Sequence, residues 1–329
     1  VPDKTDSLYV YRQDFEHDGR RQRVAGVIGA LELEEFGIGA GVLPHERTME
    51  GPKADRLALL EALRLNVSPI YGIYRGGSGL AGFFEGLEGR PTASRFADEQ
   101  GILHRLWVIT AQAEVGLLGA AVAAGPLVIA DGHHRYETAL AYHRSKPVGA
   151  PGSGSILCFC VDADSEDLVV LPYNRAAKLT GDLDPHSVLA SAGAPVTGAP
   201  AATLEASPSD HPFVFVTSEG DLLLEVEDRE VVAAVGERAP AWRDLDVVAL
   251  HEALLPRLFP GGINELSFSK DPNEIRRLVM DEGWDVGVLL KALAAAEIVD
   301  VARSGERMPQ KASYFWPKAI TGLVFRSLR

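Results

Sequence analysis

Blocks of apolar and polar residues alternate along the first half of the chain and predict its strands and helices. Runs of β-branched apolar residues between charged or glycine-containing loops predict strands at residues 24–33, 66–74, 103–110 and 127–130. Apolar residues at helical spacing and stretches of good helix formers predict helices at residues 55–63, 115–124 and 136–144. Since residues 115–124 are almost entirely apolar, we expect that helix to be buried.

The second half begins after a loop rich in Gly, Pro and Ser at residues 146–155. Residues 156–161 and 168–171 have the pattern of a strand pair, and the Ala/Pro/Ser/Gly-rich segment 190–212 predicts an exposed, variable loop. Later strands are expected at 213–217 and 285–290, and helices at 246–257 and 272–282.

We therefore predict a first domain over residues 1–148 and a second domain over residues 149–329. Strands and helices mix without strict alternation, which favours an α+β protein over a doubly wound parallel sheet.

Charge and composition narrow the classes of function. The 329 residues contain 46 acidic and 32 basic side chains, a net charge of −14, which opposes non-specific binding to nucleic acid or anionic membrane. The longest apolar run, 115–130, is interrupted by Gly125-Pro126 and is too short to span a bilayer. Two cysteines cannot form a disulfide framework and suit a reducing cytoplasm, where we expect the protein to act. The sequence leaves open whether a segment precedes Val1 and whether the protein forms a homodimer.

The segment Asp131-Gly132-His133-His134-Arg135 is the first candidate site. A short predicted strand ends here and a helix begins, so Gly132 permits a sharp turn, and the helix start favours an anion. The imidazoles and the planar guanidinium add donors suited to phosphate oxygens. The structural alternative is that Asp131 caps the helix and the histidines bond to the backbone. We favour the anion-binding interpretation.

The second candidate lies in the polar loop that contains His45 and Glu46. A kinase for a small alcohol needs a carboxylate near the hydroxyl, as a base or to position it, and Glu46 beside His45 suits this role. Asp55 and Arg56 follow closely enough to bind substrate, and Asp55 also to bind Mg²⁺. A solvated loop with an Arg47–Glu50 pair explains the same residues equally well.

Two further candidates lie in the second half. Lys311 and Lys318 stand among aromatic residues and prolines, which suits a loop that closes a phosphate pocket; a packing segment with surface lysines is the alternative. Asn174 and Arg175 form either an anion contact or a turn.

Other patterns carry less information. The match to G-x-G-x-x-G at residues 77–82 lacks the acidic residue that ends a second strand in a dinucleotide-binding unit, so we interpret it as a flexible loop. No Walker-type phosphate loop and no zinc-ligand spacing occurs in the sequence, so no dedicated metal site is predicted. Cys158 and Cys160 face the same side of a predicted strand and are interpreted as buried small hydrophobic residues.

Several segments together resemble one bacterial protein family. They are the residues 44–48 with 55–56, Asn66-x-Ser68-Pro69-Ile70-x-Gly72-x-Tyr74, His104-x-x-Trp107, IADGHHRYETAL at 129–140, Leu171-Pro172-x-Asn174-Arg175, and the segments 305–311 and 314–318. On these residues the chain is identified as a member of the family called domain of unknown function 1015. Its Asp-Gly-x-x-Arg turn is also similar to the ParB/sulfiredoxin-like superfamily, where such a turn at a helix start holds nucleotide or phosphate.

The resemblance implies a ParB/sulfiredoxin-like mixed-sheet domain followed by a second α+β domain. The superfamily includes free-serine kinases, sulfiredoxins that use ATP, and partition proteins that bind and hydrolyse CTP. The resemblance thus implies phosphate or nucleotide binding at residues 131–135, with ATP or ADP and Mg²⁺ as cofactors. Because no cysteine lies in the turn, the sulfiredoxin reaction is not expected.

The main hypothesis is a phosphoryl-transfer enzyme, most concretely a kinase for free serine or a similar small alcohol. Residues 132–135 would hold phosphates with Lys311 and Lys318, Glu46, His45 or His133 would act on the hydroxyl, and Asp131 or Asp55 would hold Mg²⁺. A phosphoserine phosphatase or a nucleotide hydrolase would use the same groups with water as acceptor. The remaining alternatives are a ParB-like nucleotide-responsive binding protein and a non-catalytic scaffold. The sequence does not identify the nucleotide, the acceptor or the direction of the reaction.

Overall fold

The chain forms two compact units. The computed structural model describes residues 3, 5–37, 39–46, 53–76, 79–147, 149–181 and 183–329, and describes the backbone alone at 53–54. Unit 1 combines Val1–Val169 with the C-terminal segment Phe315–Arg329, and unit 2 comprises Val170–Tyr314. A two-stranded ladder of β10 (Val169–Pro172) and β17 (Ser313–Trp316) lies where the chain passes from one unit to the other.

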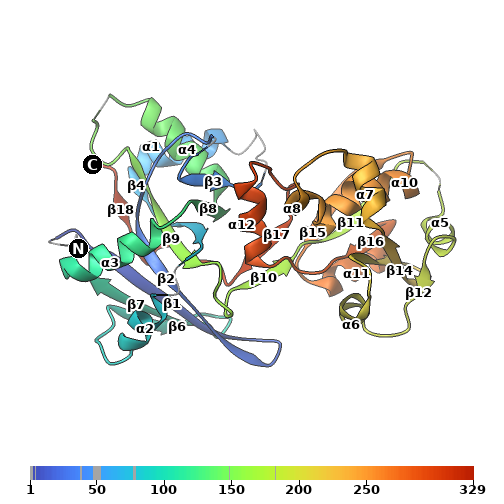
Figure 1. The fold of residues 1–329 in the computed structure, drawn as a ribbon, viewed down its shortest axis with the longest axis horizontal. Coiled ribbons are helices and arrows are strands. Elements are labelled where there is room, and N and C mark those ends of the chain that lie inside the picture. The colour runs from blue at the N-terminus through green and yellow to red at the C-terminus, as the bar shows by residue number, and fades with distance from the viewer. Residues whose placement is uncertain are drawn as a thin grey trace. The chain divides into compact units, whose positions relative to one another are not determined.

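Unit 1 is built on a mixed eight-stranded sheet with the order β3-β8-β5-β9-β2-β1-β7-β6 (Figure 1). Its strands are β1 (Leu8–His17), β2 (Arg20–Glu32), β3 (Val42–Pro44), β5 (Ile70–Tyr74), β6 (Ser94–Ala97), β7 (Leu103–Ile109), β8 (Leu127–Asp131) and β9 (Ser155–Asp162). β3 pairs in parallel with β8, and β5 in parallel with β9, whereas the other pairs are antiparallel. A mixed sheet of this kind, with a wholly antiparallel second sheet, confirms the predicted α+β class.

Helices cover this sheet and close its core. They are α1 (Lys53–Leu63), α2 (Ala81–Gly86), α3 (Gln112–Val122) and α4 (His133–Arg144). α4 packs Tyr136, Ala139 and Leu140 against the buried faces of β5, β8 and β9, and α1 lies beside α4. The short strands β4 (Leu65–Asn66) and β18 (Arg326–Ser327) pair with each other, which fastens the end of the chain to unit 1. The packing of α4 against the sheet places its first turn at the carboxyl end of β8.

The boundary of unit 1 differs from the predicted division at 148/149. β9 lies after the glycine-rich loop but pairs with β2 on one side and β5 on the other, so it belongs to the first sheet. Residues 315–329 also return to this unit. The Gly-, Pro- and Ser-rich composition at 146–155 reflects the connection between α4 and β9 and not a domain boundary. Turns and domain boundaries favour the same residues, so composition alone does not distinguish them.

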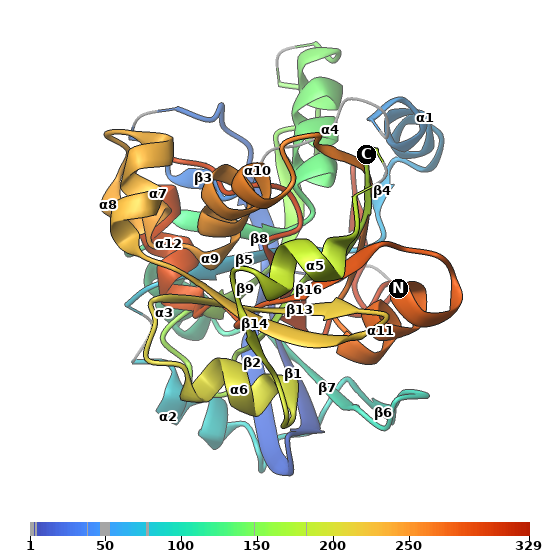
Figure 2. The ribbon, with the colours of Figure 1, turned by 90° about the vertical axis from the view of Figure 1, so that its right-hand side faces the viewer.

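Unit 2 has a six-stranded antiparallel sheet with the order β12-β14-β13-β16-β11-β15; its strands β13, β14 and β16 are labelled in Figure 2. The strands are β11 (Asn174–Leu179), β12 (Ala194–Pro195), β13 (His211–Thr217), β14 (Gly220–Val226), β15 (Ile263–Ser269) and β16 (Val286–Leu289). The helices are α5 (Pro185–Ala190), α6 (Pro200–Ala206), α7 (Asp228–Val235), α8 (Pro240–Arg243), α9 (Asp246–Val248), a π-helical segment η1 (Ala249–Leu254), α10 (Leu255–Leu258), α11 (Pro272–Asp281) and α12 (Ala295–Arg303). α6 and α11 share one apolar core with the sheet.

Three expectations about elements are corrected. α3 is not buried: Leu118 is its buried residue, while Leu117 is 49% exposed. Residues 156–161 and 168–171 do not pair with each other, because β10 pairs with β17. The segment 190–212 is not simply an exposed loop, since it contains β12 and α6 and buries Leu204 in the core of unit 2.

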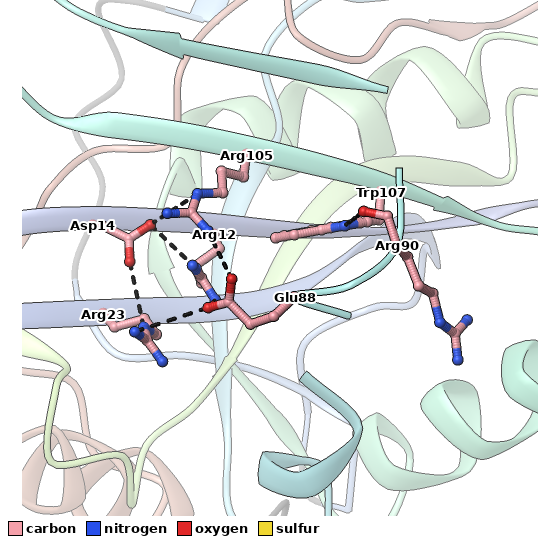
Figure 3. A network of polar contacts seen from close by, with 7 residues as sticks. All are labelled: Arg12, Asp14, Arg23, Glu88, Arg90, Arg105 and Trp107. Atoms are coloured by element: carbon pink, nitrogen blue, oxygen red, sulfur yellow. Dashed lines mark hydrogen bonds and ion pairs between the residues drawn. The ribbon is translucent and has the colours of Figure 1, made fainter. Parts of the chain in front are cut away.

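A cluster of charges lies on one face of β1, β2 and β7 in unit 1 (Figure 3). Arg12 is buried, donating from Nε to Asp14 at 3.1 Å and from Nη1 to Glu88 at 2.6 Å. Arg105 donates to the other oxygen of Glu88 at 2.9 Å, and Arg23 donates to Asp14 at 3.3 Å. Two carboxylates thus hold three guanidinium groups, which offsets much of the cost of burying Arg12.

None of the helices in the described part of the chain combines the length and the apolar character that crossing a bilayer requires.

Candidate functional site

The 131–135 turn joins β8 to α4 with an abrupt change of direction. Gly132 has φ +93° and ψ +26°, in the left-handed region that glycine adopts readily, and α4 begins at the next residue. A Cβ at this position would lie 2.9 Å from Cγ2 of Ile70 and 3.0 Å from Nε of Arg135. The position therefore requires glycine both for its backbone conformation and for space.

Arg135 fastens the turn to the neighbouring strand and loop. Its Nη1 donates to the hydroxyl of Ser68 at 2.8 Å and to the carbonyl of Pro69, and its Nη2 donates to Oδ2 of Asp131 at 2.9 Å. Burial lowers the pKa of Arg135, while the charge of Asp131 acts in the opposite direction. The guanidinium thus sets the shape of the turn and adds positive charge to it.

Lys318 comes from the C-terminal segment and reaches the same turn. Its Nζ lies 3.4 Å from Oδ1 of Asp131, and the side chains of Lys318 and Asp131 are 34% and 40% exposed. β1 holds the segment in place: Gln13 donates to the carbonyl of Lys318 at 3.0 Å, and the hydroxyl of Tyr11 accepts a hydrogen bond from the backbone of Ile320. Two cations therefore share one carboxylate in a turn that is open to solvent.

His45 and His133 lie edge to face beneath the turn, with ring centroids 4.7 Å apart. The ring of His45 bonds through Nδ1 to the carbonyl of Ile129 at 2.5 Å, so Nδ1 carries the proton of the neutral ring. The backbone N–H of His45 donates to Nε2 of His133 at 3.4 Å. Burial lowers the pKa of His45 to about 4, so this ring is neutral near pH 7. Both rings are buried, which places them under the turn rather than on its open side.

The remaining first-unit candidates lie around α1 and the strand that precedes it. Glu46 directly follows His45 and is partly exposed, while Asp55 and Arg56 are exposed in the first turn of α1. The charge of Arg56 lies close enough to lower the pKa of Arg135. The expected Arg47–Glu50 pair lies outside the described residues.

Three of the predicted site residues belong to unit 2. Asn174 accepts a hydrogen bond from the backbone of Leu290 at 3.2 Å. Arg175 is buried, with its pKa lowered to about 9 by burial, and it donates to His251 at 3.2 Å and to the carbonyl of Lys311 at 3.1 Å. The ammonium of Lys311 lies 5.2 Å from the ring centroid of Tyr173. These contacts connect residues within unit 2.

Ser68, Gln13 and Tyr11 support the turn and were not among the predicted site residues. Ser68 lies in the Asn66-x-Ser68-Pro69 motif that contributed to the family resemblance, which was a usable signal. Gln13 and Tyr11 lie in β1, where the sequence pattern showed no strand. Among the described residues, no group of three His, Cys, Asp or Glu side chains is arranged to hold a metal ion.

The profile of the family described as protein of unknown function DUF1015 matches residues 1–248. The chain belongs to this family. A search of curated protein sequences gave no match.

Solved structures of similar arrangement include a conserved hypothetical protein from Pyrococcus furiosus, with 13% identity and a TM-score of 0.46 over 92% of this chain and 95% of that one. They also include a free serine kinase in complex with AMP, with 15% identity and a TM-score of 0.44 over 90% and 91%. SbnI with a C-terminal truncation, from Staphylococcus aureus, has 11% identity and a TM-score of 0.45 over 90% and 85%. Likenesses this distant carry no ligand or reaction over to the present chain.

Proposed function

We propose that this member of the DUF1015 family binds the phosphate of a nucleotide at the 131–135 turn and transfers a phosphoryl group to a small alcohol such as serine. The observation that carries the proposal is the turn itself. A left-handed Gly132 opens the 12-residue helix α4, and the side chains of Arg135 and Lys318 meet at Asp131 on a surface open to solvent.

The electrostatics of the turn favour an anion. The N–H groups in the first turn of any α-helix lack an acceptor in that helix, and the helix dipole is positive at this end. The N-cap residue is glycine, which has no side chain to cap this helix start. With two cations and one carboxylate, the side chains of Asp131, Arg135 and Lys318 carry a net charge of +1 on a protein whose net charge is −14. A phosphate is the common ligand of such a helix start.

The histidines suggest how the acceptor hydroxyl is handled. Both imidazoles are buried and Nδ1 of His45 is bonded to the carbonyl of Ile129, whereas Glu46 is partly exposed, so we assign the base or positioning role to Glu46 rather than to His45 or His133. His45 then supports the backbone at the end of β8 through Ile129. Magnesium bound to nucleotide phosphates needs only one or two protein carboxylates; Asp131 or Asp55 would supply them, and the metal ion would neutralise phosphate charge.

Incubation of the purified protein with serine and either ATP or ADP tests the proposal, with phosphoserine and nucleotide products measured by mass spectrometry. Arg135→Gln and Glu46→Gln are expected to lower the rate at least about 100-fold. Arg144→Gln is the matched control, because Arg144 lies at the other end of α4 and pairs with exposed Glu35. Circular dichroism establishes that each variant is folded.

The outcomes separate the alternative functions. Phosphoserine that forms with the native protein and the control, but not with the two site variants, supports the kinase. Phosphate release from phosphoserine, or from the nucleotide without serine, indicates a phosphatase or nucleotide hydrolase that uses the same turn. Nucleotide binding without turnover indicates a binding protein, and the absence of any phosphate binding contradicts the proposal.

A further inference from the structure

An opening lies in unit 1 beside the turn, between α1 and α4. It has a volume of about 140 Å³, and its walls come from α1, the segment 65–68, α4 and β9. Leucines of α1 and Ile156 form an apolar side, while Arg56, Ser68 and Arg135 supply polar groups at its edge. None of the residues proposed to bind phosphate lies on the apolar side of this opening.

Two leucines at this opening are unusually exposed. Leu59 and Leu63 both line it, one turn apart on α1, and they are 56% and 38% exposed. Leucines four residues apart share one helix face, so the two side chains form a single patch. An exposed apolar patch beside converging polar groups is typical of a ligand site.

Arg135 connects this opening to the turn. Its Nη2 bonds to Asp131 at the start of α4, and its Nη1 bonds to Ser68, which lines the opening. Thr138 also lines the opening and lies three residues after Arg135 on α4, a rise of about 4.5 Å along the helix. A ligand whose phosphate lies at the first turn of α4 would therefore need only one sugar ring between that phosphate and a group placed in the opening.

The size and chemistry of the opening suit part of a ligand. Its volume is well below the roughly 300–1,000 Å³ of pockets that enclose a complete drug-sized molecule. A flat aromatic ring packs favourably against leucine side chains and also stacks on guanidinium groups. Arg56 and Arg135 border the opening, and among the described residues that line it there is no carboxylate.

From these observations we infer that this opening, the cleft between α1 and α4, binds the base of a nucleotide whose phosphate occupies the 131–135 turn. The inference rests on the proposed function and adds to it the place where the base of the nucleotide binds. The site selects nucleoside phosphates, with the base against Leu59 and Leu63, over phosphate esters that lack a base.

Titration calorimetry of the full chain with AMP, ribose 5-phosphate and inorganic phosphate tests the inference. We expect AMP to bind at least about tenfold more tightly than ribose 5-phosphate, because the base removes apolar surface from water. The double variant Leu59→Gln/Leu63→Gln is expected to lose that advantage and to bind ribose 5-phosphate as the native protein does. Since both leucines are exposed, we expect the variant to fold, which its thermal transition establishes.

Leu117→Gln is the matched control, because Leu117 is an exposed leucine of α3 that does not line the cleft. Its affinity for AMP should equal that of the native protein. Equal affinity of the native protein for AMP and ribose 5-phosphate overturns the base site and leaves the phosphate turn intact. An equal loss of AMP affinity in the Leu117 variant also overturns the base site. Failure of all three compounds to bind overturns the phosphate turn as well.

Discussion

The ammonium group of Lys318 lies 3.4 Å from a carboxylate oxygen of Asp131, although the two residues belong to the two separate chain segments that form unit 1, Phe315–Arg329 and Val1–Val169. Asp131 also accepts a hydrogen bond from Arg135 through its other oxygen. One carboxylate thus holds two cations of different origin at the start of α4. These two contacts hold Arg135 and Lys318 in place, so the turn keeps its shape before a ligand binds. A phosphate that binds at the turn would compete with Asp131 for both cations.

Substitution of Lys318 by methionine should weaken phosphate binding. The change removes a charge-assisted contact, so we expect AMP affinity to fall about tenfold or more, and Lys318→Arg to retain part of it. Titration calorimetry at two salt concentrations measures the effect, and the salt dependence should decrease in the methionine variant. Lys146→Met is the matched control, because Lys146 lies just past the other end of α4 and pairs with Glu61. A loss of affinity in the control equal to that of the Lys318 variant contradicts a specific role for Lys318.

Alanine at position 132 should destabilise the protein and abolish phosphate binding. The new Cβ would be strained at φ +93° and would lie 2.9 Å from Ile70, so we expect a loss of about 1–3 kcal/mol in the free energy of unfolding. Urea denaturation measures this loss. Gly119→Ala is the contrasting variant, because Gly119 lies in α3, where an added Cβ would have no described atom of another segment within 4 Å, and alanine should stabilise the helix by about 0.5–1 kcal/mol. Equal stability of the two variants would show that Gly132 does not need its left-handed conformation.

Acid should destabilise the protein through His45. Burial lowers the pKa of His45 to about 4, while an unfolded histidine titrates near 6.5. Between these values the unfolded chain binds more protons, so stability is retained above pH 6.5 and is lost as the pH falls towards 4. The loss from this group is about 3 kcal/mol at most. Thermal unfolding followed from pH 7 to pH 4 should show a shallower decline in His45→Gln than in the native protein. His17→Gln, which changes a more exposed ring, should leave the native slope unchanged.

His211 in unit 2 should have the opposite pH dependence. Burial lowers its pKa, but the hydrogen bond and charge of Asp246, at 2.9 Å, and the charges of Asp228 and Asp210 outweigh burial and raise it. The folded state therefore holds the proton more tightly than the unfolded state, so this stabilisation is complete below pH 6.5 and is lost as the pH rises through the raised pKa. Proton nuclear magnetic resonance of the ring measures that pKa directly. Asp228→Asn should lower it, and an unchanged value would contradict the role of Asp228.

The turn was predictable because its causes lie close together in the sequence. A glycine after a short apolar strand, followed at once by polar residues and a helix, determines the bend and the polarity of the helix start through local backbone preferences. The same is true of β5, β8 and α4, whose apolar patterns are regular. The family resemblance also depends on short segments that are read directly from the sequence, and the family assignment is confirmed.

β1 shows why other parts were not predictable. Arg12 and Gln13 are both buried in this strand, and their polarity conceals the apolar alternation that normally indicates a strand. Asp14 and Glu88 bond to Arg12, and Gln13 donates to the carbonyl of Lys318, which offsets part of the cost of burying these two side chains. Those partners come largely from distant segments, which no local pattern can identify.

Lys311 and Lys318 also show that a local sequence pattern does not identify contacts with distant segments. The sequence grouped them in one basic, aromatic segment, yet Lys311 belongs to unit 2 and Lys318 to unit 1. The sequence by itself determined the bend at Gly132, the helix that follows and the family of the chain, because neighbouring residues fix backbone geometry. Only the tertiary structure decided which distant side chains complete the turn and which leucines of α1 face the cleft beside it, because such contacts depend on the packing of segments far apart in the chain.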